Sequence, residues 1–195
     1  MKRFRPKYLG GFSSGVELED ALRTVKEPYY AVVARSNTGK SSLINALLGE
    51  NMALVSNTPG RTRCAHLFQG QGYHLIDLPG YGYASGGGTE EMSRIISETL
   101  LVDVTEGDSS RPPLRVLQLM DANRASTYII KDELMIHSLL ENKIPYRTVL
   151  TKGDCLSQSE LKKLKLLFPD NSAWMTSAKN NWGIADLREK LQRGF

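Results

Sequence analysis

Apolar residues gather along this chain in short runs that are separated by longer mixed segments. Runs of four or five mainly apolar residues at 30–33, 73–76, 146–150 and 173–176 have the length of buried strands. The mixed segments predict helices at residues 40–48, 90–101, 128–140, 157–168 and 183–192. Because strand and helix signals alternate after residue 29, an α/β fold is expected, with a mostly parallel sheet and helices on both of its faces.

One pair of strand-like runs, at 64–68 and 73–78, is separated only by the turn-forming residues 70–72, with the sequence GQG. So short a connection indicates a hairpin, which makes one edge strand antiparallel. The predicted fold is therefore a six-stranded, mostly parallel sheet with one antiparallel edge strand.

Composition places the chain among ordinary globular proteins of one domain. It has 195 residues, of which 41% are hydrophobic and 24% charged. No apolar run approaches the length needed to cross a membrane, so no membrane partner is expected. The two cysteines, Cys64 and Cys155, have neither metal-site spacing nor a disulfide pattern, which favours a reducing compartment.

Basic residues open the chain. Four lysine and arginine residues lie within the first seven positions, and no acidic residue precedes Glu17. We predict a basic N-terminal arm over residues 1–28 and a globular domain over residues 29–195. The arm is interpreted as part of an organellar targeting segment, as an ordered contact to ribosomal RNA phosphates, or as a solvated tail. The net charge of +4 is compatible with a polyanionic partner.

The most informative motif lies between the apolar run 30–33 and the helix predicted at 40–48. Residues 34–41 have the sequence ARSNTGKS, a phosphate loop that opens with Ala34 where most such loops have glycine. Backbone N–H groups of the loop wrap a phosphate, and the helix N-terminus adds positive dipole. Lys40 is expected to reach the β- and γ-phosphates, and the Ser41 hydroxyl to bind Mg²⁺. The motif predicts a nucleotide site.

A second motif selects the base. Residues 151–154, with the sequence TKGD, follow the apolar run 146–150. The Asp154 carboxylate can accept hydrogen bonds from N1–H and the exocyclic amine of guanine, an arrangement that adenine does not offer. The Lys152 stem can lie against the base plane. Residues 177–179, with the sequence SAK, suit backbone contacts with the guanine carbonyl. Guanine is therefore the predicted base.

The remaining motifs concern the metal and the γ-phosphate. Asp77, at the end of a strand, can hold Mg²⁺ through water, and Gly80 can offer its N–H to a γ-phosphate, a contact that only a triphosphate makes. A threonine that closes over Mg²⁺ is also expected, with Thr58 and Thr62 as candidates. Thr62 is favoured because it follows a Pro-Gly turn; as the alternative, its hydroxyl caps that turn.

These motifs together resemble the EngB family of ribosome-biogenesis GTPases, within the TrmE-Era-EngA-EngB-like group. The resemblance rests on residues 77–84 (DLPGYGYA), 59–62 (PGRT) and 35–42 (RSNTGKSS), and it extends from about residue 30 to the C-terminus. It implies a P-loop GTPase fold that converts GTP to GDP and phosphate, with Ser41 and Thr62 as Mg²⁺ ligands. Departures from the family pattern are Ala34, the sequence ANR at 122–124, and the glycine run 86–88.

The predicted nucleotide site combines residues of all these motifs. The residues expected to bind GTP or GDP are Ala34, Arg35, Ser36, Asn37, Thr38, Gly39, Lys40, Ser41, Ser42, Gly60, Arg61, Thr62, Asp77, Gly80, Thr151, Lys152, Asp154, Ser177, Ala178 and Lys179. Lys40, Thr62 and Gly80 are expected to support catalysis. Since no Gln follows Gly80 to orient water, intrinsic hydrolysis is expected to be slow. Resemblance to related GTPases suggests that Asn37 helps to hold K⁺ beside the phosphates; the alternative is that it stabilises the loop by bonding to the backbone.

By resemblance, the chain is expected to be a GTP-dependent assembly factor that binds precursors of the large ribosomal subunit, both rRNA and ribosomal proteins, and is monomeric off the ribosome. Two rivals are a non-hydrolysing GTP-binding scaffold and a P-loop kinase of small metabolites; the base motif at 151–154 disfavours the kinase. A bacterial source would make the protein cytoplasmic, and a eukaryotic one would place it in a mitochondrial or other organellar matrix.

Overall fold

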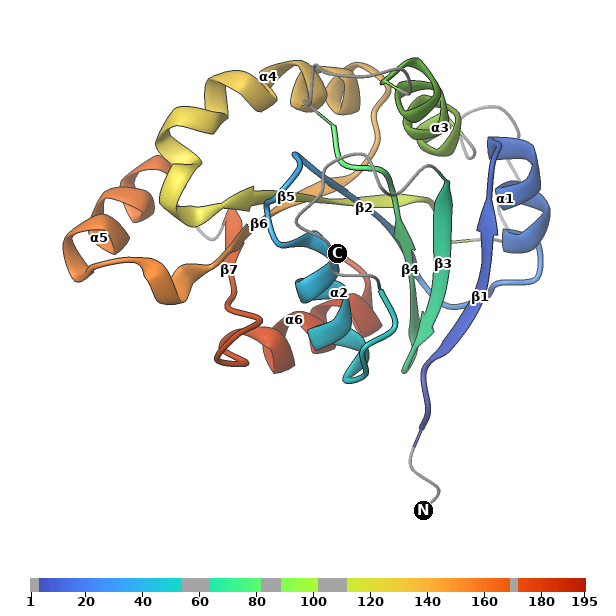
Figure 1. Cartoon of the computed structure of the whole chain (residues 1–195), viewed down its shortest axis with the longest axis horizontal. Helices are drawn as coiled ribbons and strands as arrows, with labels where there is room; N and C mark the ends of the chain where they lie inside the picture. The colour runs from blue at the N-terminus through green and yellow to red at the C-terminus, as the bar shows by residue number, and fades with distance from the viewer. Residues whose placement is uncertain (1–3, 54–63, 82–88, 102–111, 169–171) are drawn as a thin grey trace.

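The computed structural model describes residues 4–53, 64–81, 89–101, 112–168 and 172–195 of the chain (Figure 1). The described strands form one seven-stranded sheet in the order β1-β3-β4-β2-β5-β6-β7. They are β1 (Lys7–Phe12), β2 (Tyr29–Ala34), β3 (Ala65–Gly70), β4 (Tyr73–Asp77), β5 (Arg115–Asp121), β6 (Tyr146–Thr151) and β7 (Ala173–Met175). The helices are α1 (Gly15–Leu22), α2 (Lys40–Leu48), α3 (Thr89–Leu101), α4 (Ala125–Glu141), α5 (Gln158–Leu167) and α6 (Ile184–Arg193).

The sheet is mostly parallel, as the alternating pattern predicts. β2 pairs in parallel with β4 and β5, and β6 pairs in parallel with β5 and β7. β2 is buried along its whole length, which explains why its sequence is a continuous apolar run rather than an alternating one. The hairpin predicted around residues 70–72 joins β3 to β4 in antiparallel fashion. The α/β fold class is therefore confirmed.

The number of described strands needs correction from six to seven. Two pairings at one edge are antiparallel, β1 with β3 and β3 with β4, so β3 alone runs opposite to the other strands. The additional strand is β1, which pairs with β3 from Lys7 opposite Gln69 to Phe12 opposite Ala65. Four of its six residues are exposed. A strand so little buried has no apolar alternation, and this is why the hydrophobic pattern did not indicate it.

The described part of the predicted basic arm also differs from that expectation. After β1, the chain forms α1, whose Leu18 and Leu22 are completely buried in the core. These leucines are four residues apart, so both lie on the same face of the helix. Because β1 extends the sheet and α1 contributes to the core, residue 28 does not mark the edge of a separate unit.

Helices cover both faces of the sheet (Figure 1). On one face, α1, α3 and α4 contribute apolar side chains to a core layer that includes Val33 and Val116. On the other face, α2 and α6 pack over a layer that includes Val32 and Leu117. Neighbouring residues of β2 and β5 thus point to opposite faces. A smaller apolar cluster lies between α5, β5 and β6.

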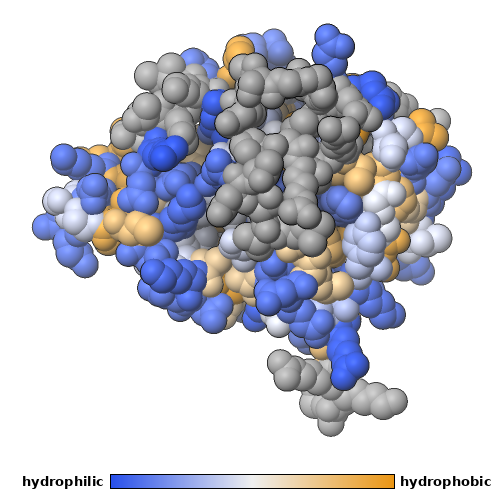
Figure 2. All heavy atoms as spheres, in the orientation of Figure 1, coloured by the Kyte–Doolittle hydropathy of each residue, from blue (hydrophilic) through white to orange (hydrophobic). Residues whose placement is uncertain are grey.

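All five predicted helices occur, as α2 to α6, and their ends lie close to the predicted ones. α5 begins at a capping box, in which Ser157 and Glu160 bind each other's backbone N–H groups. In the part of the chain that the structure describes, no helix is both long and apolar enough to cross a membrane. The face shown in Figure 2 is mainly hydrophilic, with apolar residues in small separate groups.

The carboxyl ends of the parallel strands form one edge of the sheet, and the sequence motifs lie there. Because β2, β4, β5, β6 and β7 run in the same direction, the segments that follow them emerge at a common edge. Each motif singled out from the described part of the sequence lies at this edge or immediately beyond it.

Candidate functional site

The phosphate loop connects β2 directly to the first turn of α2. Two residues of the loop have left-handed backbone conformations, Asn37 with φ of 66° and Gly39 with φ of 95°. The Arg35 carbonyl accepts hydrogen bonds from the Thr38 N–H at 3.3 Å and from the Thr38 hydroxyl at 2.7 Å, which closes the loop on itself. Gly39 precedes the helix and makes no side-chain cap. The first turn of α2 therefore keeps N–H groups that suit an anion.

Lys40 and Asp77 meet at the base of this loop. The Lys40 ammonium forms an ion pair with the Asp77 carboxylate, and their side chains are only 10% and 5% exposed. Lys40 is the first residue of α2, and Asp77 is the last residue of β4. The structure therefore places the predicted phosphate-binding cation beside the predicted magnesium-binding carboxylate. Ser41 follows in the same turn of α2, and hydroxyl and carboxylate oxygens are suitable ligands for Mg²⁺.

The chain beyond β4 lies against the phosphate loop. The Tyr81 N–H donates to the Ala34 carbonyl at 3.0 Å, and the Ser36 N–H donates to the Tyr81 carbonyl at 3.1 Å. Gly80 consequently sits close to the loop: a Cβ atom at this position would come within 3.1 Å of the Ser36 hydroxyl oxygen. The residue predicted to contact a γ-phosphate thus adjoins the residues predicted to bind the other phosphates.

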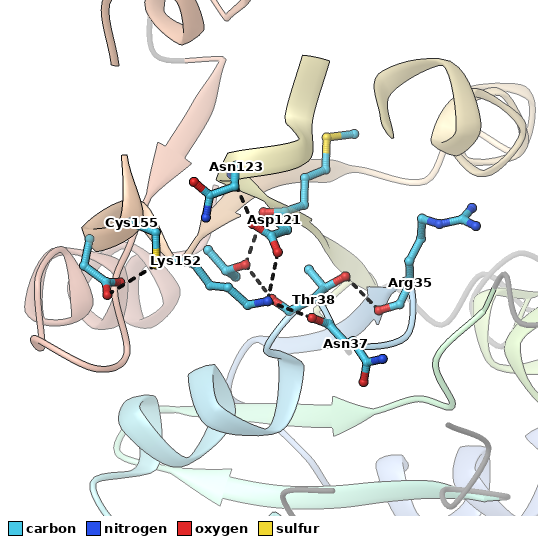
Figure 3. A network of polar contacts seen from close by, with 10 residues as sticks. Arg35, Asn37, Thr38, Asp121, Asn123, Lys152 and Cys155 are labelled. Carbon is cyan, nitrogen blue, oxygen red and sulfur yellow. Dashed lines mark hydrogen bonds and ion pairs between the residues drawn. The ribbon is translucent and has the colours of Figure 1, made fainter. Parts of the chain in front are cut away.

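The residues that follow β6 are tied to the same loop from its other side (Figure 3). The Lys152 ammonium donates to the Asn37 carbonyl and to the Asp121 carboxylate, both at 2.8 Å. The Thr151 hydroxyl donates to the Thr38 carbonyl at 2.6 Å. The bonds to Asn37 and Thr38 connect positions more than one hundred residues apart in sequence, and they join the predicted base motif to the phosphate loop.

Asp121 is a member of this network that sequence reasoning did not identify as a site residue. It ends β5, and its carboxylate also accepts a hydrogen bond from the Asn123 N–H at 3.0 Å. A signal was present, since an aspartate directly after a buried strand of a parallel sheet lies at the edge where sites form. The choice of Lys152 as its partner depends on β5 and β6 being neighbours, which only the topology establishes.

Asp154 is held by the loop that carries residues 177–179. The buried Ser177 hydroxyl donates to the Asp154 carboxylate at 2.6 Å, and this hydrogen bond is the main reason that the pKa of Asp154 is lowered. The Asn180 N–H donates in turn to the Ser177 oxygen at 3.2 Å. A charged, fixed carboxylate is what the recognition of guanine N1–H and its exocyclic amine requires.

A cavity of about 630 Å³ opens between α2 and α6, next to these residues. It is bordered by the predicted site residues Ser42, Ala178 and Lys179, and continues along the two helices to Arg188. The Arg188 side chain donates to the carbonyls of Ala46 and Leu47, which end α2. The cavity thus adjoins the predicted binding residues and is lined by side chains of both helices.

The structure therefore brings together the predicted residues of four segments: the phosphate loop, residues 77–80, residues 151–154 and residues 177–179. Gly60, Arg61 and Thr62, with the rival candidate Thr58, lie outside the described residues. The exposed Asn37 amide points away from Lys152 (Figure 3). Among the described residues, no three His, Cys, Asp or Glu side chains form a group suited to a metal ion. A magnesium site here would thus need oxygen ligands from outside such a group, as the phosphates of a nucleotide supply.

Comparisons with known proteins agree with this arrangement. Residues 29–152 match the family model described as 50S ribosome-binding GTPase. A probable GTP-binding protein EngB from Bdellovibrio bacteriovorus is 39% identical over 161 residues, which cover 80% of this chain and 74% of the relative. A protein of the same description from Aquifex aeolicus is 35% identical over 191 residues, 95% of this chain and 97% of the relative.

Solved structures give the same fold. The crystal structure of a probable GTP-binding protein EngB superposes with a TM-score of 0.63 at 23% identity, covering 85% of this chain and 98% of the other. Era from Aquifex aeolicus, bound to GDP and aluminium fluoride, gives 0.64 at 20% identity, covering 87% of this chain and 57% of the other. At these identities the likeness concerns the fold.

Proposed function

The chain belongs to the EngB family of 50S ribosome-binding GTPases, and from this premise we propose that it is a nucleotide-controlled assembly factor for the large ribosomal subunit. Family membership makes the protein a GTP-binding enzyme that hydrolyses GTP. It thereby decides against the non-hydrolysing scaffold and the metabolite kinase. What is proposed is the ribosomal partner and the role of each site residue in binding and hydrolysing GTP.

The proposed base recognition rests on one observation above the others, the hydrogen bond from Ser177 to Asp154. It orients a charged carboxylate at the edge of the sheet where the phosphate loop also lies. Lys152, fixed by Asn37 and Asp121, holds the base-binding motif in place against the phosphate loop. With GTP bound, Asp154 accepts the guanine hydrogen bonds, and Ala178 and Lys179 lie at the carbonyl side of the base.

The phosphates are proposed to bind at the first turn of α2. Lys40 exchanges its contact with Asp77 for the β- and γ-phosphate oxygens, so binding separates a nearly buried ion pair and replaces it by stronger charge contacts. Ser41, Thr62 and, through water, Asp77 hold Mg²⁺, which neutralises part of the phosphate charge when it is bound. Gly80 donates its N–H to the γ-phosphate and so distinguishes GTP from GDP.

Hydrolysis by the isolated protein is proposed to be slow, because Tyr81 and not a glutamine follows Gly80. The exposed Asn37 amide is proposed to share K⁺ with the nucleotide phosphates, and the added charge would speed the reaction. Phosphate release in KCl and in NaCl at equal ionic strength measures this effect. Equal rates in the two salts would leave Asn37 as a residue that only stabilises the loop.

The proposed partner is a precursor of the large ribosomal subunit, contacted through rRNA and ribosomal proteins. The family description names 50S ribosome binding, and the net charge of +4 is compatible with an RNA surface. The protein is proposed to be monomeric when it is off the ribosome. It would act in the cytoplasm of a bacterium, or in a mitochondrial or other organellar matrix of a eukaryote.

Co-sedimentation with large-subunit precursors tests the proposal. Three parallel samples contain a non-hydrolysable GTP analogue, GDP or no nucleotide, and mature large subunits serve as the control particle. We expect the protein to sediment with the precursor in the presence of the analogue and to remain in the supernatant with GDP. Absence from the pellet in all three states, with GTP affinity intact, would refute the ribosomal part of the proposal and leave the GTPase.

A further inference from the structure

Tyr81 occupies the position immediately after Gly80, and its backbone is fixed to the phosphate loop at both ends. Its N–H bonds to Ala34 at 3.0 Å, and its carbonyl accepts from Ser36 at 3.1 Å, which forms a short parallel bridge with Arg35. Gly80 cannot move relative to the loop unless these two hydrogen bonds lengthen. Contacts that fix the position of Tyr81 therefore also fix the position of Gly80.

The side chain of Tyr81 lies beneath the site, against the core layer formed with α1, α3 and α4. The Arg35 guanidinium lies over its ring, 5.9 Å from the ring centre, in the geometry of a cation–π contact. In Figure 3 the Arg35 side chain extends away from the Lys152–Asp121 network. Arg35 thus belongs to the phosphate loop by its backbone and to the cluster around Tyr81 by its side chain.

Asp132 of α4 completes this cluster. Its side chain is 1% exposed, and one carboxylate oxygen lies 3.7 Å from an Arg35 nitrogen. Neither carboxylate oxygen makes a hydrogen bond within the described part of the chain. Burial raises the pKa of Asp132 above its usual value, although Tyr81 and the Arg35 charge act against this rise. A buried carboxylate is strongly destabilising when its cation is removed, so Asp132 and Arg35 hold each other's side chains in position.

Two further polar groups surround this pair without hydrogen bonds of their own. The Tyr81 hydroxyl and the Gln118 amide are both buried and unbonded among the described residues. Burial raises the pKa of Tyr81, and the nearby Asp132 charge raises it further. Buried polar groups rarely lack hydrogen bonds, and when they do a functional reason is to be sought. Here the cluster is held by charge and packing, so its position depends on the pair of Arg35 and Asp132.

We infer that Arg35 and Asp132, acting through Tyr81, are positioning residues that hold Gly80 against the phosphate loop and set the preference of the protein for GTP over GDP. The inference rests on the role proposed above for Gly80, whose N–H meets a γ-phosphate that GDP lacks. Displacing Gly80 should therefore weaken the triphosphate complex and leave the diphosphate complex almost unchanged. A residue that merely stabilised the fold would affect both complexes alike.

The test compares the dissociation constants of a non-hydrolysable GTP analogue and of GDP in Asp132→Asn and Arg35→Lys. For the analogue we expect a Kd about five- to tenfold higher in either variant, with the Kd for GDP within about twofold of the original. In the double variant, the Kd for the analogue should be no higher than in the single variant that binds it less tightly, because both substitutions break the same contact. Arg35→Lys keeps the test decisive if Asp132→Asn does not fold.

Tyr30→Phe is the matched control. Tyr30 is also completely buried, and its hydroxyl donates to the Leu191 carbonyl at 2.7 Å in the other core layer. Removing this hydroxyl should lower the melting temperature without changing the ratio of the two dissociation constants. Equal weakening of both nucleotides by Arg35→Lys and Asp132→Asn, or an unchanged ratio, would overturn the inference.

Gly80→Ala separates this inference from the assignment on which it rests. Its added methyl would crowd the Ser36 hydroxyl and displace the chain. If Gly80→Ala reduces the preference for the triphosphate while the Arg35 and Asp132 variants keep it, the inference fails and the role of Gly80 stands. If all three variants keep the preference, the distinction between GTP and GDP does not depend on the position of Gly80, and the inference fails together with the role proposed for Gly80.

Discussion

At the scale of single residues, the hydrogen bond between Ser177 and Asp154 controls when the base can be recognised. Because this bond lowers the pKa of Asp154, the carboxylate stays charged to a lower pH than an ordinary aspartate. Guanine recognition needs the charged form. GTP binding should therefore persist as the pH falls and be lost only when Asp154 is protonated.

Ser177→Ala should move this loss of binding to higher pH. Without the hydroxyl, the pKa of Asp154 returns toward its usual value, so protonation begins earlier on acidification. Titration of GTP affinity between about pH 6 and pH 2.5, a range that includes the usual pKa of an aspartate and extends below it, measures the midpoint. Ser14→Ala, which removes a hydroxyl from the N-terminus of α1, is the control and should leave the midpoint unchanged. The same midpoint in Ser177→Ala would mean that Ser177 does not tune Asp154.

The predicted site residues come from motifs whose spacing reflects the chemistry of phosphate and guanine, and those that the structure describes lie together; their contacts with a nucleotide stay a prediction. Asp77 ends a parallel strand, and Lys40, Asp154 and Ser177 lie in the segments that follow such strands; parallel strands bring these positions together. The partners between segments were not predictable in the same way. That Lys152 reaches Asp121, and that Asp132 lies under Arg35, depends on which strands and helices are neighbours.

At the scale of elements, α1 is, with β1, a part of the fold that the hydrophobic pattern did not indicate. A signal for it exists, since Ser14 and Glu17 have capping-box spacing and the Glu17 N–H bonds to the Ser14 hydroxyl at 3.3 Å. Leu18 and Leu22 supply the apolar face. The basic residues that precede this segment favoured an arm, and the helix is only eight residues long, too short for a clear periodic pattern.

The packing of α1 predicts that this segment stabilises the domain. Leu18→Ala should lower the free energy of unfolding by about 2–5 kcal/mol, because Leu18 is completely buried and the substitution leaves a cavity. Val16→Ala, in the same helix at a position that is 71% exposed, should change it by less than about 0.5 kcal/mol. Urea unfolding of both variants measures the difference. A negligible effect of Leu18→Ala would contradict a stabilising role for α1.

The helices and strands that were predicted correctly have either continuous burial or a clear boundary signal. β2 is wholly buried and reads as one apolar run, and α5 starts at the box of Ser157 and Glu160. The strand β1 lacks both, because it is mostly exposed and, among the described strands, it pairs with β3 alone. Pairing between strands distant in sequence is a tertiary property, so local pattern gives little indication of it.

At the scale of the whole molecule, the topology brings four nucleotide motifs to one edge of the sheet and supports them from below. The Lys152 network joins the base side to the phosphate loop, while Tyr81 joins the chain after β4 to the same loop. The buried cluster of Arg35, Tyr81 and Asp132 extends this connection to α4. The contacts of Tyr81 and Arg35 therefore link the chain after β4 to α4 through the core.

Co-sedimentation of Asp154→Asn with large-subunit precursors tests the central claim most directly. An asparagine can donate to the xanthine oxygen that replaces the guanine amine, so this variant should respond to a different nucleotide. We expect it to sediment with the precursor in the presence of a non-hydrolysable xanthosine triphosphate analogue and not with the guanosine analogue, the reverse of the unsubstituted protein. Sedimentation that still follows the guanosine analogue, or follows no nucleotide, would contradict a switch controlled by guanine recognition at Asp154.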